Sequence, residues 1–385
     1  MDKKIVDILF ALLNQEMGFK ALPEDFANAI KQEDLKPLYL LARKHDLAHI
    51  IGNSLEKLGV FSTQSEASKR FILDRNRAIF RVETLKAELE IICKELSKNN
   101  VEHIPLKGAV IRNLYPETWM RTSCDIDVLV KKEELSRAIS LLTDKLGYEC
   151  KSIGQHDAQI YTPNGVHIEL HYSLQEGETE KQAGKYLDSV WQVALPSENC
   201  TRVLPDDFLY TYIISHMIKH VKFGGCGIRA VMDIYLLSKS FDLSQTRKAL
   251  KACDFLVFAN AVENLAKAWF EEGEKDELSL RLEEYILTGG VYGSFDNKIR
   301  ARQSRQKTKF GYFMRRLFMP YRELKFRYPV LRKCPLLYPF CLVARWASLI
   351  FDNETKERIS KEVKKSGEVA KDDYGIRALL HDLKI

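Results

Sequence analysis

Two aspartates separated by one residue suggest a metal-binding site. Asp125 and Asp127 open a run, residues 125–130, that is otherwise apolar. In a β-strand, residues i and i+2 point to the same side, so the two carboxylates would face the same way. Carboxylates held together at the start of a buried strand repel each other and lose hydration, which costs free energy unless a divalent cation binds them. The alternative is a pair that forms surface salt bridges.

A later segment supplies a third carboxylate. His167, Glu169 and His171 alternate with apolar residues, so a strand would place the three side chains on one face. Glu169 completes a carboxylate triad with Asp125 and Asp127 if the two strands are neighbours. Oxygen-rich clusters of this kind suit Mg²⁺ or Mn²⁺. A zinc site that uses the histidines is the alternative, but H-x-E-x-H on a strand lacks the helical spacing of the zinc motif H-E-x-x-H.

Lys107 and Gly108 are candidates for phosphate binding, because they stand where a predicted strand gives way to a predicted helix. Backbone N–H groups at a helix start bind anions, and glycine lets a phosphate approach closely. The segment is not a Walker loop, since the second glycine and the Lys-Ser/Thr pair are absent. Arg121, four residues before Asp125, is either a bidentate phosphate clamp or a surface residue.

Two predicted helices in the second half of the chain carry charged residues at helical spacing. In the first, His216, Lys219 and His220 stand at i, i+3 and i+4 and therefore share one face. In the second, Arg229 and Asp233 form an i, i+4 pair. That pair is expected either to contact substrate or to join a salt-bridge network between helices.

The elements that must position these residues predict an α+β fold. Residues up to about 98 show helical periodicity, which returns from residue 205. Between them the order strand–helix–strand–helix–strand–strand–strand indicates a small mixed-sheet core. The predicted strands are residues 101–106, 124–130, 148–153, 159–161 and 166–174. The predicted helices of the core and of the second half are residues 107–115, 132–146, 208–221, 228–238, 244–253, 257–270 and 277–287.

These elements divide the chain into four predicted regions. They are an N-terminal helical region (1–100), an α/β core (101–200), a helical domain (201–298) and a basic, aromatic-rich segment with a tail (299–385). His45 and His49 share one face of a predicted N-terminal helix. Because no further ligands can be placed beside them, we expect core or interface histidines rather than a metal site.

The charge of the chain is unevenly distributed. Its 385 residues carry 59 Lys and Arg against 53 Asp and Glu, a net charge of +6. Residues 300–345 hold thirteen cations and one acid, so the rest of the chain carries −6. Aromatic residues lie between these cations. The candidate partners of this segment are an anionic membrane surface, nucleic acid and the acidic body of the protein itself.

The composition and the apolar runs predict a cytoplasmic globular protein. Hydrophobic residues make up 45% of the chain and charged residues 29%, which excludes a disordered polyelectrolyte. The apolar run 5–13 contains Asp7 and is not followed by a cleavage site, and the run 335–351 is too short to span a membrane and contains Arg345. The eight cysteines form no C-x-x-C pair and are expected to be reduced thiols.

Several of these motifs, taken in order, resemble the uncharacterised bacterial nucleotidyltransferase family of the polymerase-β-like superfamily. The resemblance rests on residues 106–108, 115–116, 121, 125–130, 169–171, 216–220 and 229–233. It runs, with gaps, from about residue 38 to about residue 345. The order of the motifs is more specific than any single one.

The resemblance implies two-metal transfer of a nucleoside monophosphate from an NTP to an acceptor, with release of pyrophosphate. Asp125 and Asp127 would bridge two Mg²⁺ (or Mn²⁺) ions, and Glu169 would ligate one ion and activate the acceptor hydroxyl. The acceptor itself stays open. The residues expected to bind the nucleotide are Lys107, Gly108, Arg121, His216, Lys219, His220 and Arg229, among which Lys219 would neutralise the leaving pyrophosphate.

One residue departs from the superfamily pattern. The usual phosphate loop is Gly-Ser, whereas this chain has Gly108-Ala109, so Lys107 and backbone N–H groups would have to compensate for a hydroxyl. The alternative function is therefore a non-catalytic nucleotide-binding or scaffold protein with a degenerate core. The family's frequent association with genes for bacterial surface polysaccharides favours a membrane surface over nucleic acid as partner of residues 300–345, at the inner membrane face.

Overall fold

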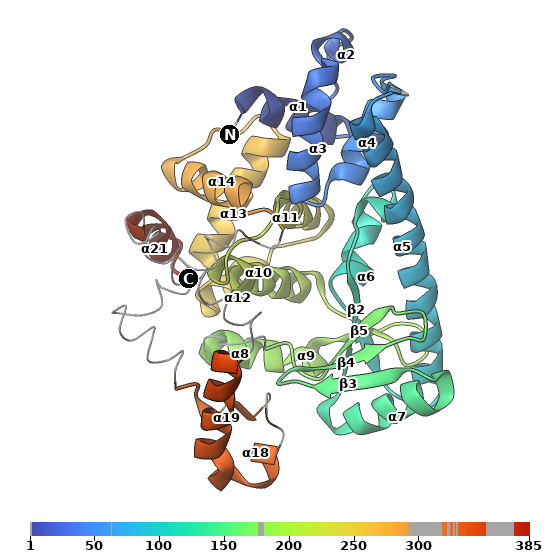
Figure 1. The fold of residues 1–385 in the computed structure, drawn as a ribbon, viewed down its shortest axis with the longest axis vertical. Coiled ribbons are helices and arrows are strands. Elements are labelled where there is room, and N and C mark those ends of the chain that lie inside the picture. The colour runs from blue at the N-terminus through green and yellow to red at the C-terminus, as the bar shows by residue number, and fades with distance from the viewer. Residues whose placement is uncertain are drawn as a thin grey trace.

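A five-stranded mixed sheet lies between helices that precede and follow it in the chain (Figure 1). The computed structural model describes residues 2–62, 64–175, 181–291, 293, 318–321, 324–325, 328, 330–351 and 373–385. The α+β class predicted from the sequence is confirmed, with a small mixed sheet as its core. Half of the basic segment 300–345 and most of the tail after residue 351 lie outside the described residues.

The strand order places the two predicted site strands side by side. The strands are β1 (His103–Pro105), β2 (Asp125–Val130), β3 (Glu149–Ile153), β4 (Asp157–Tyr161) and β5 (His167–His171), in the order β1-β2-β5-β4-β3. Strand β5 runs parallel to β2, and the other neighbours are antiparallel. The parallel register sets Asp127 opposite Glu169 and Asp125 opposite His167.

The alternation along β2 separates an apolar face from a polar one. Ile126, Val128 and Val130 pack in one buried cluster with residues of α5 (Glu66–Lys98) and α7 (Leu135–Leu146). Because successive side chains point to opposite faces, Asp125 and Asp127 face away from these two helices. One face of the strand thus anchors it in the core while the other presents the carboxylates.

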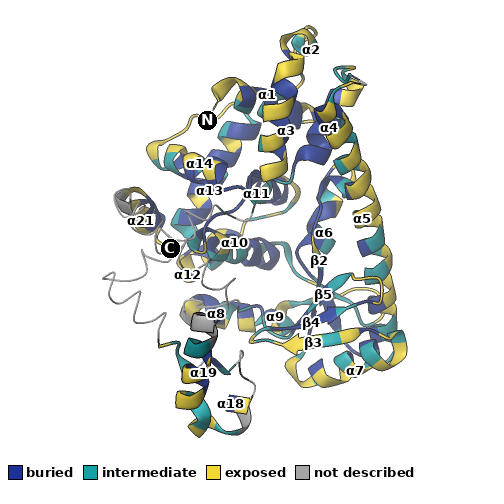
Figure 2. Ribbon diagram, in the orientation of Figure 1, coloured by how far each residue is buried: buried dark blue, intermediate teal, exposed yellow. Residues whose placement is uncertain are grey.

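Helices from both ends of the sequence share the larger hydrophobic core. It includes α1 (Lys3–Glu16), α3 (Leu35–Lys44) and α4 (Ala48–Lys57) together with α10 (Asp206–Lys222), α11 (Ile228–Ser240), α13 (Leu256–Phe270) and α14 (Glu277–Gly289). Figure 2 shows α10 and α11 as largely buried helices at the centre of the molecule. The other elements are α2 (Phe26–Ala29), α6 (Gly108–Ile111), α8 (Lys181–Asp188), α9 (Val190–Val193), β6 (Leu195–Pro196), β7 (Arg202–Val203), α12 (Thr246–Ala252), α18 (Val330–Lys333), α19 (Tyr338–Phe351) and α21 (Asp373–Asp382).

The predicted elements occur with small differences in length. The helix predicted over residues 107–115 is α6 followed by a 3₁₀ turn, Arg112–Leu114, and it ends before Pro116 because proline disfavours helical backbone in the residue that precedes it. Strand β5 ends at His171, three residues earlier than predicted. Helix α10 begins directly after Pro205 with Asp206 and Asp207, which interact favourably with the helix dipole.

His45 and His49 are buried histidines at the interface between helical segments, as predicted. Nε2 of His45 lies 3.3 Å from the carbonyl oxygen of Leu287, and Nε2 of His49 lies 2.9 Å from that of Met120. Burial lowers the pKa of His45 to about 4. Both rings therefore connect distant segments through backbone carbonyls.

The described residues of the C-terminal segment before residue 351 fold on a small core of their own, whereas Ile376, Leu379, Leu380 and Leu383 join the larger core. The small core contains Leu324, Leu331, Cys341 and Leu342. Within the described residues, no helix has the length and apolar character needed to cross a membrane.

Candidate functional site

The parallel pairing of β2 and β5 brings three carboxylates together. Potential ligand atoms of Asp125, His167 and Glu169 lie within 4.8 Å of one another, and so do those of Asp127, Glu169 and His171. Glu169 belongs to both groups because it stands opposite Asp127 across the strand pair. We call Asp125, Asp127 and Glu169, with Lys107 and His171, the carboxylate site.

Asp127 is the most deeply buried acid of this site, and two donors converge on it. Its Oδ1 accepts from Nζ of Lys107 at 2.9 Å and lies 2.8 Å from Nε2 of His171. Burial alone would raise the pKa of the Asp127 carboxyl, but the Lys107 ammonium and the hydrogen bond from His171 hold that pKa well below its usual range. Asp127 is therefore an anion whose charge is already partly compensated.

His171 ties two of the acids together. Its Nε2 also lies 3.4 Å from Oε2 of Glu169. Burial and the Lys107 charge lower the pKa of His171, yet its hydrogen bonds to Asp127 and Glu169 outweigh them and raise it to about 9. The sequence placed His171 on the ligand face of its strand but gave no indication that it would bridge two carboxylates.

Asp125 is the acid with unmet charge. Burial and then repulsion by Asp127 and Glu169 raise the pKa of its carboxyl to about 6. Among the described residues, no side chain or backbone donor forms a hydrogen bond to this carboxylate. Carboxylate oxygens held in this way fit a hard divalent cation such as Mg²⁺, which would relieve the repulsion.

Lys107 reaches Asp127 from a backbone conformation that is rare for a residue with a side chain. Its φ is 44° and its ψ is −114°. Such strain persists only where surrounding contacts impose it. The N–H of Leu106 donates to the carbonyl of Asp127 at 3.0 Å, and the N–H of Ile111 donates to that of Lys107 at 2.9 Å. These bonds fix Lys107 between β2 and α6.

Gly108 allows the chain to pass close to the segment that leads into β2. A Cβ added at Gly108 would lie 3.2 Å from both Cβ and Oγ of Ser123. Arg112 fastens the same contact, because its Nε donates to the Gly108 carbonyl at 2.6 Å and its Nη2 donates to Ser123 Oγ at 3.1 Å. Ser123 Oγ in turn donates to the carbonyl of Asp125 at 3.0 Å. Sequence reasoning missed Arg112, whose i, i+4 spacing from Gly108 was the available signal.

Arg121 lies in a buried ion pair. Its guanidinium donates to both carboxylate oxygens of Asp233 at 2.8–3.1 Å, and the hydroxyl of Tyr115 donates to the same carboxylate at 2.7 Å. Arg121, Asp233 and Tyr115 are all less than a tenth exposed. Arg121 therefore ties the segment before β2 to α11.

Arg229 pairs with Asp46 rather than with the nearby Asp233. Its Nη1 forms an ion pair with Asp46 and donates to Thr122 Oγ1 at 2.9 Å, while Thr122 Oγ1 donates to Asp46 at 2.6 Å. Of the two expectations for Arg229 and Asp233, the structure shows the salt-bridge network. We call the two ion pairs Arg121–Asp233 and Arg229–Asp46, with Tyr115 and Thr122, the ion-pair network.

His216, Lys219 and His220 lie together on α10, as their spacing predicts. Nε2 of His216 lies 3.0 Å from Nε2 of His220. Lys219 is half-buried and His220 is exposed. Neither histidine is a member of the two ligand groups around the carboxylates.

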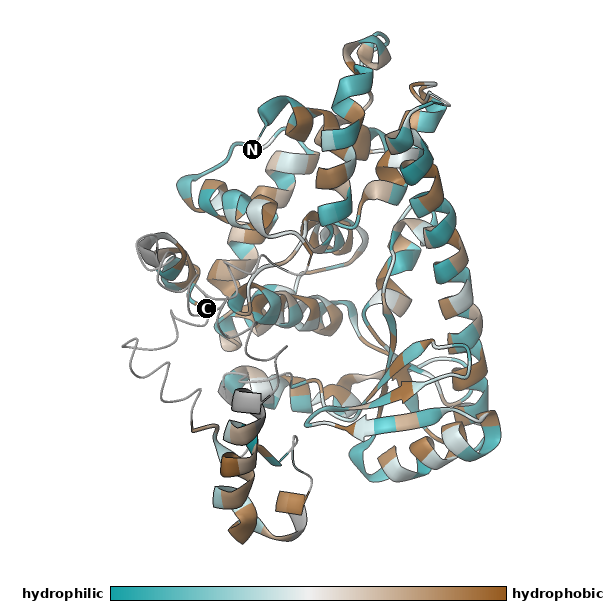
Figure 3. Ribbon diagram, viewed as in Figure 1, coloured by the Kyte–Doolittle hydropathy of each residue, from teal (hydrophilic) through white to brown (hydrophobic). Residues whose placement is uncertain are grey.

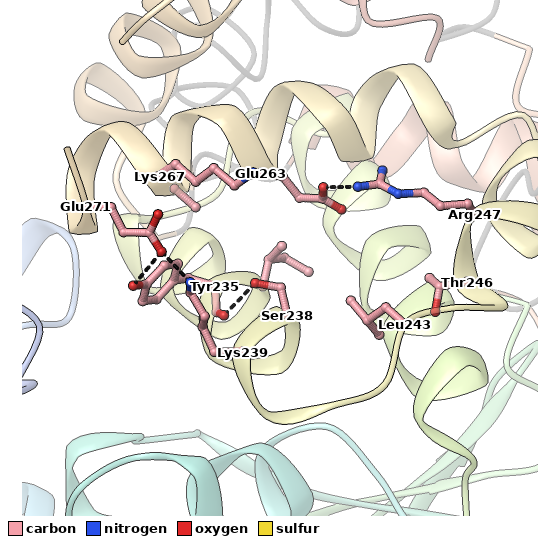
Figure 4. A pocket seen from close by; sticks show the side chains of 11 residues that line it. Tyr235, Ser238, Lys239, Leu243, Thr246, Arg247, Glu263, Lys267 and Glu271 are labelled. Carbon is pink, nitrogen blue, oxygen red and sulfur yellow. Dashed lines mark hydrogen bonds and ion pairs between the residues drawn. The ribbon is translucent and has the colours of Figure 1, made fainter. Parts of the chain in front are cut away.

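A pocket of about 220 Å³ lies elsewhere, between α11, α12 and α13 (Figure 4). Its lining contains none of the carboxylate-site residues. Four of the charged groups that line it pair, Lys239 with Glu271 at 2.6 Å and Arg247 with Glu263. This cavity is therefore distinct from the carboxylate site.

The comparison with known families matches the region that builds the site. A family model described as "Uncharacterised nucleotidyltransferase" matches residues 31–271. The chain belongs to this family. The match covers the whole sheet, α10, α11 and α13, and hence the carboxylate site and the ion-pair network of this nucleotidyltransferase family member. Neither the curated proteins nor the solved structures contain a match.

Proposed function

We propose that the protein is a Mg²⁺-dependent nucleotidyltransferase that transfers a nucleoside monophosphate from an NTP to a hydroxyl or phosphate of an acceptor and releases pyrophosphate. The observation that carries this proposal is the meeting of Asp125, Asp127 and Glu169 across the parallel strands β2 and β5. Membership of a nucleotidyltransferase family supports the reaction class.

Asp125 and Asp127 would hold the two divalent cations. Asp125 contributes a carboxylate without a hydrogen-bond donor, and the Lys107 and His171 contacts keep Asp127 ionised. When bound, a divalent cation would neutralise charge on the NTP phosphates and on the transition state. The two aspartates thus orient the α-phosphate through groups that the sheet holds rigidly.

Glu169 would bind the second cation and accept the proton of an acceptor hydroxyl. His171 fixes the Glu169 carboxylate from one side. The acceptor oxygen forms its bond to the α-phosphorus while the bond to the pyrophosphate oxygen breaks. The proton of an acceptor hydroxyl passes to Glu169.

The cationic residues would contact the phosphates or hold the site. Lys107, which contacts Asp127, and the Gly108 backbone would bind the triphosphate. Lys219, His216 and His220 would neutralise the leaving pyrophosphate from α10. Arg121 and Arg229 act as positioning residues in this proposal, because both are engaged in ion pairs with carboxylates. The protein would work in the cytoplasm, and its eight cysteines, all free thiols, support a reducing compartment.

Labelled nucleotides test the proposal. The full-length protein is incubated with Mg²⁺, each α-labelled NTP in turn and a cell extract as the source of acceptor. We expect one NTP to yield a labelled product together with pyrophosphate, and Asp125→Asn to abolish both. Nucleotide binding without pyrophosphate release would instead favour a non-catalytic nucleotide-binding or scaffold protein, the function to which Ala109 in the phosphate loop points.

A further inference from the structure

The helix α19 and the turn before it present an exposed face that is apolar throughout. The exposed residues between positions 334 and 347 are Pro335, Leu336, Pro339, Phe340, Val343 and Ala344. Leu336 is 85% exposed, Phe340 71% and Val343 57%. A surface helix normally turns charged or polar residues toward water. We therefore expect a binding partner to bury this apolar face. We call Leu336, Phe340 and Val343 the apolar stripe.

The opposite side of this segment is fixed by its own packing. Cys341 and Leu342 of α19 are buried against Leu324 and Leu331. The hydroxyl of Tyr338 donates to the carbonyl of Met319 at 2.8 Å, which fastens the start of α19. The apolar stripe therefore cannot turn inward without breaking this small core.

The position of the segment leaves the stripe accessible. Helices α18 and α19 project from the rest of the described chain at the bottom of the view in Figure 1. Figure 3 shows α19 coloured as hydrophobic along much of its length, unlike the mixed colouring of the long α5. The stripe thus lies on a projection that could reach a flat surface.

The net charge of the sequence segment that contains the stripe indicates which kind of partner would bind it. Residues 318–345 contain six Lys or Arg and one acid, Glu323. A second copy of this segment would bring like charges together, whereas an anionic surface would attract it. Arg345, the one cation in the sequence of α19, is buried, so the attraction would come from the net charge of the segment and the insertion from the apolar stripe. At 14 residues α19 is about 21 Å long, too short to span a bilayer.

We propose that the apolar stripe docks onto an anionic lipid surface, with α19 lying in the plane of the interface. Leu336, Phe340 and Val343 enter the boundary between headgroups and acyl chains, and the net positive charge of residues 318–345 draws the segment to anionic headgroups. This inference goes beyond nucleotidyl transfer and does not depend on it, because it rests on residues outside the carboxylate site.

Vesicle flotation with the full-length protein tests the proposal. The vesicles consist of phosphatidylcholine alone or of phosphatidylcholine with phosphatidylglycerol. We expect flotation with the anionic vesicles, and we expect the double variant Leu336→Ser/Phe340→Ser to weaken it at least about tenfold, because two large apolar side chains no longer enter the lipid. Both residues are exposed, so melting temperature should not change.

The matched control is Phe80→Ser, since Phe80 is 77% exposed on α5, far from the stripe in sequence. It should float like the wild type. Absence of flotation by the wild type, or equal flotation of the double variant, would overturn the proposal. The proposal would also be overturned if sedimentation showed a concentration-dependent dimer of the wild type that the double variant does not form, since the stripe would then bind a second copy of the protein.

Discussion

The carboxylate site and the ion-pair network are both assembled from charged residues far apart in the sequence, yet they balance charge differently. In the network, two arginines face two aspartates, and each guanidinium meets a carboxylate. In the site, three carboxylates face Lys107 and His171, and the Asp125 carboxylate has no donor among the described residues. Balanced pairs hold a structure together, whereas an excess of buried carboxylate attracts a cation.

Replacing Asp125 should have the largest effect on activity and little on folding. Asp125→Asn removes a cation ligand and also removes repulsion with Asp127 and Glu169. We expect the rate of pyrophosphate release to fall roughly 10³-fold or more, corresponding to several kcal/mol of transition-state stabilisation. The midpoint of urea unfolding should stay equal or rise. If Asp125→Asn keeps its activity, or unfolds at a lower urea concentration than the wild type, Asp125 has a structural role like that of the ion-pair network.

Replacing Arg121 should have the opposite profile. Arg121→Ala leaves the buried Asp233 carboxylate without its cation, and breaking a buried ion pair costs about 3–5 kcal/mol. Urea unfolding measures this loss. The control is Arg70→Ala, which removes an exposed i, i+4 pair with Glu66 and should cost about 0.5 kcal/mol or less. The distinction between network and site fails if the two variants are equally stable.

The pH dependence of stability tests a third kind of buried group, the neutral histidine. The folded pKa of His45 is about 4 against an ordinary 6.5, so its protonation favours the unfolded state. Stability from this residue is complete above pH 6.5 and is lost as the pH falls toward 4, by at most about 3 kcal/mol. His45→Gln should make the slope of unfolding free energy against pH shallower by about 1.4 kcal/mol per pH unit near pH 5. An unchanged slope would show that His45 is not buried neutral.

The smallest effect is expected for His171, which contacts the carboxylates but contributes no negative charge to the site. His171→Gln should weaken Mn²⁺ binding about 10–100-fold, because Asp127 and Glu169 lose the side chain that orients them. Electron paramagnetic resonance of free Mn²⁺ measures the affinity. Tighter binding in the variant would mean that His171 competes with the cation rather than supporting it.

The strands and the carboxylates could be predicted because they depend on local patterns. Alternation put Asp125 and Asp127 on one side of a strand and Glu169 on the ligand face of another, and only their adjacency had to be supplied by the fold. The ion-pair network could not be predicted in the same way. Arg121 and Asp233 are 112 residues apart.

Local spacing also suggested a partner that the fold does not use. Arg229 and Asp233 stand at i, i+4, but each pairs with a residue from another part of the chain. Packing against the segment before β2 buries Arg121 and Asp233 together, and burial makes a close, bidentate ion pair necessary. The exposed apolar face of α19 could not be predicted from the sequence either, because periodicity alone does not show which side of a helix is packed.

Mn²⁺ binding to the full-length protein tests the central claim, that the excess carboxylate charge at β2 and β5 holds a divalent cation. Wild-type protein and Asp125→Asn are titrated with Mn²⁺, with Asp144→Asn, an exposed carboxylate on α7, as control. We predict that the wild type and the control bind alike and that Asp125→Asn binds more than about 100-fold more weakly, beyond the range expected for a residue outside the ligand sphere. Equal binding by the wild type and Asp125→Asn would contradict the claim.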